Sequence, residues 1–357
     1  MAKDFTSMED SNRSGNPTIH EVSSPARRTV LQCGAAASML ATLGGCASLK
    51  EMLAKAPTLS FKPVPPGFGD RLIVPEGYNA QVIAAWGEPV GIAGQMPAFR
   101  MDASNTAKDQ AVQMGMHHDG LVFFPLGDGR ERGLLAMNHE YTDDGLLHVG
   151  GMTEWTAEKV HKSMNAHGLS VIEVEMKDGR WSMVRPSRFA RRVTLFTPFE
   201  VGGPAAGHSM MRTAADPEGR RVLGTLNNCA SAITPWGTYL SGDRPSAHEE
   251  RWGIRARGRG YQWHVHEERF DAVKHPNEPN RFGWVVELDP MDPSSTPIKR
   301  TALGRAAHEG AWVSVTRDGR AVVYSGEDAQ FEYIYKFVSR DRIRPAGHGL
   351  TAAQANR

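Results

Sequence analysis

The sequence repeats one local pattern: two short apolar runs separated by a turn that contains Asp-Gly. Asp-Gly between apolar runs favours a hairpin of two antiparallel strands, because both central positions of the tight turn accept positive φ. A chain built from such units is predicted to be all-β. Three pairs of runs show the pattern, namely residues 121–124 with 134–137, 169–174 with 181–184, and 312–316 with 321–324.

The spacing of these hairpins indicates how they are arranged. With a further turn at 217–220 that leads into 222–225, they follow one another at intervals of roughly 50, 40 and 100 residues, and a four-stranded propeller blade takes about 40 to 50 residues. Further strands are predicted at 222–225 and 282–290. Because one blade cannot bury its own faces, several blades are expected to stack around an axis as a β-propeller.

The remaining segments between the strands are predicted to be mostly irregular. Residues 241–281 are rich in charge, His and Gly and are expected to form a loop-like insertion. A single helix is predicted over residues 154–166, with Thr153 as its N-cap.

The first fifty residues are typical of an export leader. Arg27 and Arg28 precede a mildly apolar, Ala-rich run at 29–43, which is too short and too polar to span a membrane. The arginine pair resembles a twin-arginine export signal, read by the twin-arginine translocation machinery. Residues 43–46 resemble a lipoprotein cleavage site, in which Cys46 would be lipidated. The alternative for the Ala-rich run at 29–43 is an amphipathic helix of the mature protein.

The domain organisation follows from these patterns. A periplasmic or secreted protein is expected, anchored to the membrane if Cys46 carries lipid. The predicted regions are a disordered N-terminus with the signal peptide at 1–49, a Pro-rich linker at 50–70, the propeller at 71–340 and a polar tail at 341–357.

Charge and cysteine content narrow the possible functions. The chain has 41 basic and 40 acidic residues, for a net charge of +1, which argues against a general nucleic-acid-binding surface. Three cysteines do not make a disulfide framework. Since Cys33 and Cys46 lie in the predicted leader, Cys229 is the only cysteine of the folded part.

Cys229 lies in the most distinctive stretch of the chain. It follows Asn227 and Asn228 and precedes a Thr-Pro-Trp-Gly turn at 234–237. Thr225 and Leu226 are predicted to be in a strand. A thiol where a strand runs into a loop, beside polar side chains, is placed to hold a ligand. The alternative is a small buried apolar residue.

Acidic residues also gather where strands are predicted to begin or end. Glu140 and Glu309 each follow a His, and Asp328 follows Glu327. Carboxylates at strand ends are oxygen ligands for Ca²⁺ or Mg²⁺, and a thiolate adds a softer ligand suited to Fe or Zn. The alternative is that these carboxylates are simply solvated.

These motifs together resemble the PhoX family of secreted bacterial alkaline phosphatases. The resemblance implies a six-bladed propeller exported by the twin-arginine route, a cluster of Fe³⁺ and Ca²⁺, and hydrolysis of small phosphomonoesters. Cys229 resembles the iron-ligating cysteine and Glu309 a cluster carboxylate, with Glu140 and Asp328 as further metal-site candidates. The segments that carry the resemblance are 138–141, 203–208, 224–240, 281–287, 302–309 and 324–338.

The sequence departs from the family pattern in ways that affect the expected function. After residues 238–240 the family has Cys-Glu-Glu-Asn, whereas residues 241–244 are Ser-Gly-Asp-Arg, so a carboxylate is missing or is replaced by Asp243. Gly-Asp-Asp appears as Gly-Glu-Asp at 326–328. The family also continues past Arg357 with further acidic ligands and an Arg that contacts phosphate.

An incomplete propeller is therefore expected. Three hypotheses remain open at this point. They are a metal-dependent phosphatase, a catalytically inactive truncated propeller and a lipid-anchored propeller that serves as a binding module.

Overall fold

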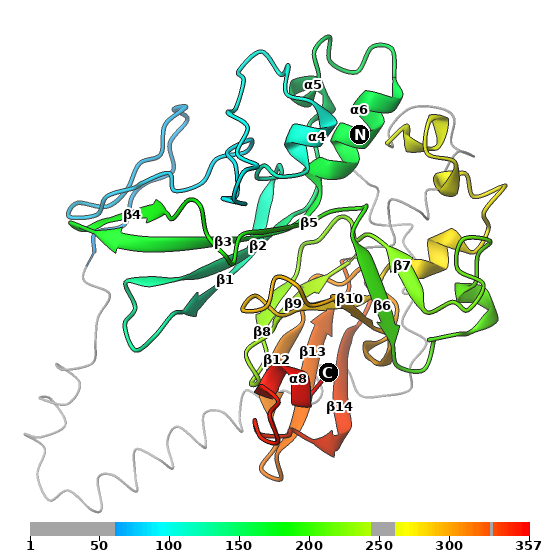
Figure 1. Ribbon diagram of the computed structural model, residues 1–357. Coiled ribbons are helices and arrows are strands. Elements are labelled where there is room, and N and C mark those ends of the chain that lie inside the picture. Colours follow the sequence, from blue (N-terminus) through cyan, green and yellow to red (C-terminus); the bar gives the residue numbers. More distant parts are fainter. Residues whose placement is uncertain (1–60, 244–260, 329–330) are drawn as a thin grey trace, which may run out of the picture. The chain divides into compact units, whose positions relative to one another are not determined.

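The computed structural model describes residues 61–243, 261–328 and 331–357. The predicted leader, with Arg27, Arg28 and Cys46, lies outside these ranges. The chain divides into two compact units, residues 1–81 and 82–357. In the described part of the first unit, residues 61–81, the rings of Phe61 and Tyr78 meet edge to face with centroids 5.8 Å apart. The second unit contains every strand and helix named below (Figure 1).

The first sheet is antiparallel and contains two of the predicted hairpins, which are thereby confirmed. The Asp-Gly turns join β1 to β2 and β3 to β4, and β5 pairs with β3 beside β4. Its strands are β1 (His118–Pro125), β2 (Arg132–His139), β3 (Gly168–Lys177), β4 (Arg180–Met183) and β5 (Arg191–Val193).

The second sheet has six strands in the order β7-β6-β11-β10-β9-β8. Its neighbours pair antiparallel except for β6 and β11, which run parallel. The Thr-Pro-Trp-Gly segment is the turn between β8 and β9, where the Gly237 N–H donates to the Thr234 carbonyl over 3.0 Å. The strands are β6 (Pro198–Gly202), β7 (Arg221–Leu223), β8 (Ser231–Ile233), β9 (Tyr239–Gly242), β10 (Val285–Leu288) and β11 (Ile298–Arg300).

The third sheet holds the last predicted hairpin and one further strand. Its members are β12 (Trp312–Val315), β13 (Arg320–Gly326) and β14 (Ile334–Arg342), all antiparallel. Val323 of this sheet packs with Leu240 and Val285 of the second sheet. The three sheets of the described residues do not close into a ring. The prediction of an all-β, incomplete propeller is therefore confirmed.

The predicted helix exists but begins one turn later. The helix α6 (Ala157–Ala166) is capped by Thr156, whose hydroxyl accepts from the Lys159 N–H over 3.3 Å. The predicted start at 154 was wrong because Glu154 has a positive φ of 46° and the Thr153 hydroxyl donates instead to the Gly150 carbonyl.

The expectation of only one helix was also wrong. The described part of the chain contains three single-turn helices as well, each begun by a side-chain cap: α4 (Ala107–Gln110), α5 (Asp144–Leu147) and α8 (Ala352–Ala355). Figure 1 shows α4, α5 and α6 gathered together.

The predicted insertion has an ordered second part. Residues 261–281 contain three short 3-10 helices, and Trp263 and Phe270 from this segment are buried in the main core. Residues 244–260 lie outside the described part. The 3-10 helices of the described chain are η2 (Ser209–Met211), η3 (Trp263–Val265), η4 (Glu268–Phe270), η5 (Glu278–Arg281) and η6 (Thr301–Leu303).

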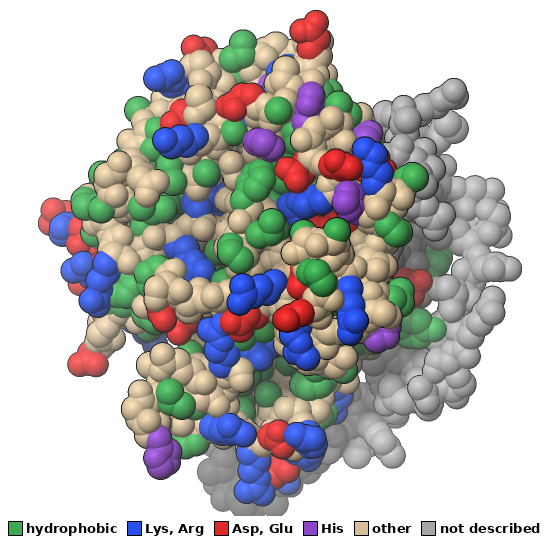
Figure 2. All heavy atoms as spheres, turned by 45° about the vertical axis from the view of Figure 1, so that its right-hand side comes forward, with side chains coloured by type: hydrophobic (Ala, Val, Ile, Leu, Met, Phe, Trp, Pro, Cys, Tyr) green, Lys and Arg blue, Asp and Glu red, His purple; other side chains and the backbone are tan. Residues whose placement is uncertain are grey.

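The surface of the described residues shows no separation of charge by sign on the face drawn in Figure 2. Lys and Arg side chains are interspersed there with Asp and Glu side chains, in keeping with the near-zero net charge. Among the helices that the structure describes, none combines the length and the apolar character needed to cross a bilayer.

Candidate metal centre

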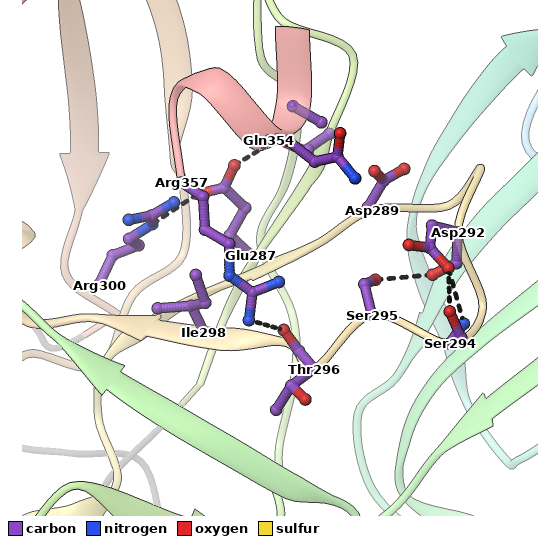
Figure 3. A pocket seen from close by; sticks show the side chains of 12 residues that line it. Glu287, Asp289, Asp292, Ser294, Ser295, Thr296, Ile298, Arg300, Gln354 and Arg357 are labelled. Carbon is purple, nitrogen blue, oxygen red and sulfur yellow. Dashed lines mark hydrogen bonds and ion pairs between the residues drawn. The ribbon is translucent and has the colours of Figure 1, made fainter. Parts of the chain in front are cut away.

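Two groups of polar side chains have the composition of a ligand site. The first lines a cavity of about 250 Å³ beside α8 (Figure 3). Both of its arginines are paired: Arg300 with Glu287 of the same lining at 2.5 Å, and Arg357 with Glu200, outside the lining, at 3.0 Å. Asp292 is engaged by the N–H and hydroxyl of Ser294. These contacts connect the chain's last residues to the second sheet, so the cavity is explained by a structural role.

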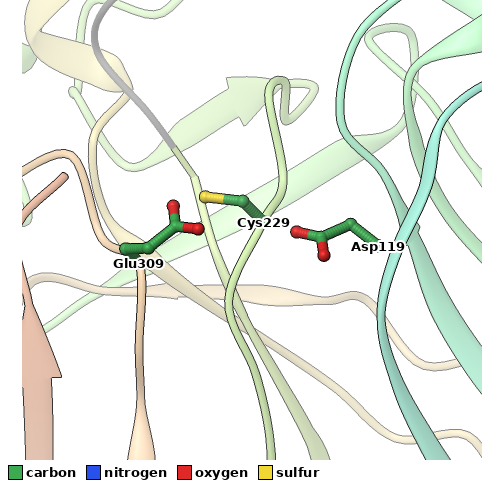
Figure 4. Close-up of side chains that lie close together, drawn as sticks. All are labelled: Asp119, Cys229 and Glu309. Atoms are coloured by element: carbon green, nitrogen blue, oxygen red, sulfur yellow. The ribbon is translucent and has the colours of Figure 1, made fainter. Parts of the chain in front are cut away.

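The second group is formed by Asp119, Cys229 and Glu309. One ligand atom from each lies within 4.8 Å of the others. Figure 4 shows the two carboxyl groups on either side of the Cys229 side chain. Because protein ligands lie about 2.0–2.6 Å from a bound cation, donors this close together can share one ion. Asp119 lies in β1 of the first sheet, whereas Cys229 lies in the segment that leads into β8 of the second sheet and Glu309 in the segment that leads into β12 of the third.

The segment that carries Cys229 is held by buried polar side chains. The Asn228 amide donates to the Thr225 hydroxyl over 2.8 Å and to the Ser241 hydroxyl over 2.9 Å. The Cys229 N–H donates to the Gly242 carbonyl, and its thiol donates to the His308 carbonyl over 3.1 Å. The strand predicted at Thr225 and Leu226 was wrong, because these residues follow the irregular path that this network fixes.

Asp119 is placed by its cross-strand partner, Asn138. The two residues face each other across β1 and β2, next to a register shift between Asp119 and Leu121. The fully buried Asn138 amide donates to the Ala230 carbonyl over 2.8 Å and accepts from the Tyr239 hydroxyl over 2.8 Å. Asn138 therefore ties the strand beside Asp119 to the segment that carries Cys229.

Two glycines allow the sheets to approach one another at this centre. A Cβ on Gly120 would lie 2.6 Å from the Ser231 Cβ, and a Cβ on Gly242 would lie 2.3 Å from the His308 carbonyl oxygen. Both distances are too short for any side chain. Gly120 thus brings β1 against β8, and Gly242 brings β9 against the residue that precedes Glu309.

Glu309 stands at the exposed side of the group, whereas Cys229 is buried. The Glu309 N–H donates to the Gly326 carbonyl over 3.0 Å. Its neighbour His308 is buried, with Nδ1 2.6 Å from the Ser325 hydroxyl and Nε2 3.1 Å from the Gly304 carbonyl. These contacts fix the backbone from which Glu309 projects.

The histidines around the centre add little positive charge. Burial lowers the pKa of His118 and of His308 below the ordinary value of 6.5, and it lowers the pKa of His139 further. All three rings are therefore mainly uncharged at neutral pH. The carboxyl groups of Asp119 and Glu309 are then the charged groups among the three candidate ligands, and they favour a cation.

Comparison with known proteins agrees with this geometry. A family model described as alkaline phosphatase PhoX matches residues 59–356, a range that includes all three residues of the centre. The chain belongs to the alkaline phosphatase PhoX family. No curated protein matches the chain.

A solved structure gives the second comparison. The chain is similar to Pseudomonas fluorescens PhoX in complex with vanadate, a transition state analogue, with 45% sequence identity and a TM-score of 0.75. The match covers 80% of this chain and 51% of that chain. This member of the PhoX family therefore spans about half the length of the solved relative.

The structure brings together two of the four residues that the PhoX resemblance singled out. Cys229 and Glu309 meet, and Asp119 joins them. Glu140 and Asp328 are not part of this three-residue group. The Glu140 carbonyl accepts from the Asn227 amide over 3.0 Å, and the Asp328 N–H donates to the Ala307 carbonyl over 2.9 Å.

Asp243, the candidate replacement for a PhoX-family carboxylate, has a different partner. Its side chain is fully buried and accepts from Lys299 Nζ over 2.5 Å. It also accepts from the Leu226 N–H over 3.4 Å. Asp243 is thus held in an ion pair within the second sheet.

Asp119 was missed by sequence reasoning, although one signal pointed to it. The Asp-Gly turn at 128–129 sets the register of the first hairpin, which brings Asp119 level with His139, and the register shift between Asp119 and Leu121 moves it opposite Asn138. Asn138 belongs to the Asn-His-Glu motif that was already a candidate. Extending the hairpin beyond its apolar residues would have added Asp119 to the set.

Proposed function

We propose that this chain contributes metal ligands to the active site of a phosphomonoester hydrolase of PhoX type. The observation that carries the proposal is the convergence of Asp119 of β1, Cys229 of the segment before β8 and Glu309 of the segment before β12, whose ligand atoms lie within 4.8 Å of one another. Membership of the alkaline phosphatase PhoX family supports phosphomonoesters as the substrate class.

The donor set supports a mixed metal site. Asp119 and Glu309 offer hard oxygen donors suited to Ca²⁺, and the Cys229 sulfur offers a softer donor suited to iron. We therefore propose Ca²⁺ and Fe³⁺ as the cofactors, with Cys229 on the iron. When bound, such ions polarise phosphoryl oxygens and neutralise the negative charge that develops during transfer.

The chain's own residues define how a substrate would approach. Cys229 is 5% exposed and closes the inner side of the centre, whereas Glu309 faces solvent. A small phosphomonoester would therefore enter from the side of Glu309. Cys229, whose N–H donates to the Gly242 carbonyl, stays at the inner side of the donor set.

The test is hydrolysis of p-nitrophenyl phosphate by the purified full chain with Fe³⁺ and Ca²⁺ present. Because the chain spans about half of the solved relative, the assay is run alone and with the half of the Pseudomonas fluorescens PhoX chain that lies outside the match. The control is Cys229→Ala. We expect turnover above the control in at least one arm. Turnover equal to that of Cys229→Ala in both arms would refute the proposal.

We also propose that the chain is exported by the twin-arginine machinery and works in the periplasm or outside the cell. Support comes from Arg27-Arg28 before the Ala-rich run. Replacing both arginines by lysine should leave the protein in the cytoplasmic fraction. Lipidation of Cys46, if it occurs, should add the mass of acyl chains to the mature N-terminus, and Cys46→Ser should abolish it.

A further inference from the structure

A third group of polar side chains lines a cavity of about 260 Å³ at the start of α6. The segment before α4, the residues after α5 and the first two turns of α6 form its walls, and Figure 1 shows these three helices gathered together. The cavity shares no residue with the metal centre. Its charged or titratable lining residues are His148, Glu158, Lys159 and Lys162. These four side chains decide which ligand the cavity suits.

Two lysines bring positive charge to the cavity. Lys162 is 4% exposed, and its Nζ donates to the Ala103 carbonyl over 2.7 Å. Lys159 Nζ donates to the Gly151 carbonyl over 2.9 Å and also to the Thr153 carbonyl. Because an ammonium group has three N–H donors, each lysine has more donors than these carbonyls accept. Burial lowers the pKa of Lys162, since its charged form loses water, and an anion in the cavity would offset that loss.

His148 supplies a buried nitrogen that lacks a partner. The residue is 4% exposed, and its Nε2 lies 3.1 Å from Asp144 Oδ1. Because a carboxylate only accepts hydrogen bonds, Nε2 carries the proton, and Nδ1 of the neutral ring is an acceptor. Nδ1 is buried and has no hydrogen-bond partner among the described residues. A buried acceptor of this kind needs a donor, and a ligand bound in the cavity can supply one.

The remaining charged group of the cavity is already engaged. Glu158 Oε1 accepts from the Ala107 N–H over 2.6 Å. Two ammonium groups against one carboxylate leave a net positive charge at the cavity. The helix α6 also begins at this wall, with N–H groups that its own hydrogen bonds do not use. The cavity therefore favours an anion, and His148 Nδ1 favours an anion that also carries an O–H.

We propose that the cavity binds hydrogen phosphate, the form of inorganic phosphate that keeps one O–H. Lys159 and Lys162 would donate to its ionised oxygens, and its O–H would donate to His148 Nδ1. Sulfate has the same tetrahedral shape and charge but no O–H, so it would leave Nδ1 unsatisfied. The Asp144–His148 pair would thus distinguish phosphate from sulfate. Phosphate is the product of phosphomonoester hydrolysis, but its binding here requires neither the metal centre nor catalysis.

The test is isothermal titration calorimetry of the purified full chain with potassium phosphate and, separately, with potassium sulfate at pH 8. The Cys229→Ala chain is titrated in the same way, which separates the cavity from the metal centre. Lys162→Met removes an ammonium group of the cavity, and His148→Phe removes Nδ1 while keeping a ring. Lys108→Met is the matched control, because Lys108 is exposed on α4 and does not line the cavity.

We expect Cys229→Ala to bind one equivalent of phosphate, at least about tenfold more tightly than sulfate. Introduced into that chain, Lys162→Met and His148→Phe should each weaken phosphate binding by at least about tenfold, and Lys108→Met should leave it unchanged. His148→Phe should also abolish the preference for phosphate over sulfate, which a purely structural role of the ring would not change.

Two results would overturn the proposal without any substitution in the cavity. They are the absence of phosphate binding and equal affinity of Cys229→Ala for the two anions. Phosphate binding that is lost in Cys229→Ala but kept in His148→Phe would also overturn it, and would assign the anion to the metal centre. All of these readouts are independent of phosphatase activity.

Discussion

Lys299 Nζ donates to Asp243 Oδ2 over 2.5 Å, and neither side chain is exposed to solvent. The same ammonium donates to the Arg281 carbonyl and lies 4.1 Å above the Phe282 ring centroid. Burial raises the pKa of Asp243 to about 6, against the pull of Lys299. The pair links the end of β9 to β11 across β10, inside the sheet that carries Cys229.

Replacing Lys299 by Met should make stability depend on pH. Without the ammonium, the pKa of Asp243 in the folded state rises further above 6, while in the unfolded state it stays near 3.8. A carboxyl with a raised folded pKa stabilises the fold only while protonated. Relative to the parent chain, the unfolding free energy of Lys299→Met should therefore fall between pH 6 and 8, by about 1.4 kcal/mol per pH unit. Urea denaturation at pH 5.5, 7 and 8 measures it.

The double variant Asp243→Asn with Lys299→Met is the control for this prediction. It lacks the carboxyl group, so its stability relative to the parent chain should not fall with pH above 6. A loss in Lys299→Met that is equal at pH 5.5 and pH 8 would show that the pair is not responsible.

Asp119→Asn should lower the metal content of the purified protein. The substitution keeps the size of the side chain and removes one of three charged donors that lie within 4.8 Å of one another. We expect at least one equivalent of metal per chain to be lost, measured by inductively coupled plasma mass spectrometry after dialysis. Asp128→Asn, in the exposed turn of the same hairpin, should leave the metal content unchanged. Equal metal content in the two variants would show that Asp119 is not a ligand of the centre.

The hairpins could be predicted because their signals are local. Asp178 adopts a positive φ of 52° and Gly179 one of 74°, as an Asp-Gly turn requires. Cys229 and Glu309 could be proposed because each lies in a motif of its own. Extending the first hairpin could place Asp119 beside the Asn-His-Glu motif, but its approach to Cys229 could not be predicted, since it depends on Asn138 reaching Ala230, which is 92 residues away in sequence.

Local sequence preferences predicted the wrong secondary structure where polar side chains form hydrogen bonds that compete with strands and helices. Thr225 suits a strand by its β-branched side chain, yet its hydroxyl bonds to Asn228 within an irregular segment. The start of α6 was misplaced because two threonines three residues apart, Thr153 and Thr156, can both serve as caps. Only the surrounding structure decides between such equivalent choices.

Gly242→Ala should destabilise the protein and weaken the metal centre together. The added Cβ would lie 2.3 Å from the His308 carbonyl oxygen and 2.9 Å from the Ala230 Cβ. Because the Cys229 N–H bonds to the Gly242 carbonyl, any shift of β9 also moves the sulfur. We expect a loss of about 1–3 kcal/mol in urea denaturation, together with reduced metal content.

Gly129→Ala is the matched control for Gly242→Ala. Its new Cβ would have the Glu131 nitrogen, 4.0 Å away, as its nearest contact. The change should stay within about 0.5 kcal/mol of the parent chain. Equal stability of the two alanine variants would show that the close approach at Gly242 relaxes without cost.

Tyr239→Phe tests the hydrogen bonds that join the first sheet to the second. The fully buried Tyr239 hydroxyl lies 2.7 Å from the Gly120 carbonyl and 2.8 Å from Asn138 Oδ1. The two acceptors share the single hydroxyl proton, so removing it takes away a buried donor, which should cost about 1–3 kcal/mol. Tyr324→Phe, at a hydroxyl-bearing ring that is 42% exposed, should cost less than about 0.5 kcal/mol.

The metal content of Tyr239→Phe separates positioning from ligation. All three donors remain, so the protein should still bind metal. The affinity should fall by about tenfold, because the Tyr239 hydroxyl contacts Gly120, which follows Asp119 in β1, and Asn138, which pairs with Asp119 from β2. Competition with a chelator measures this shift. Affinity equal to that of the parent chain, together with the expected loss of stability, would mean that the bonds between the sheets support the fold without setting the geometry of the centre.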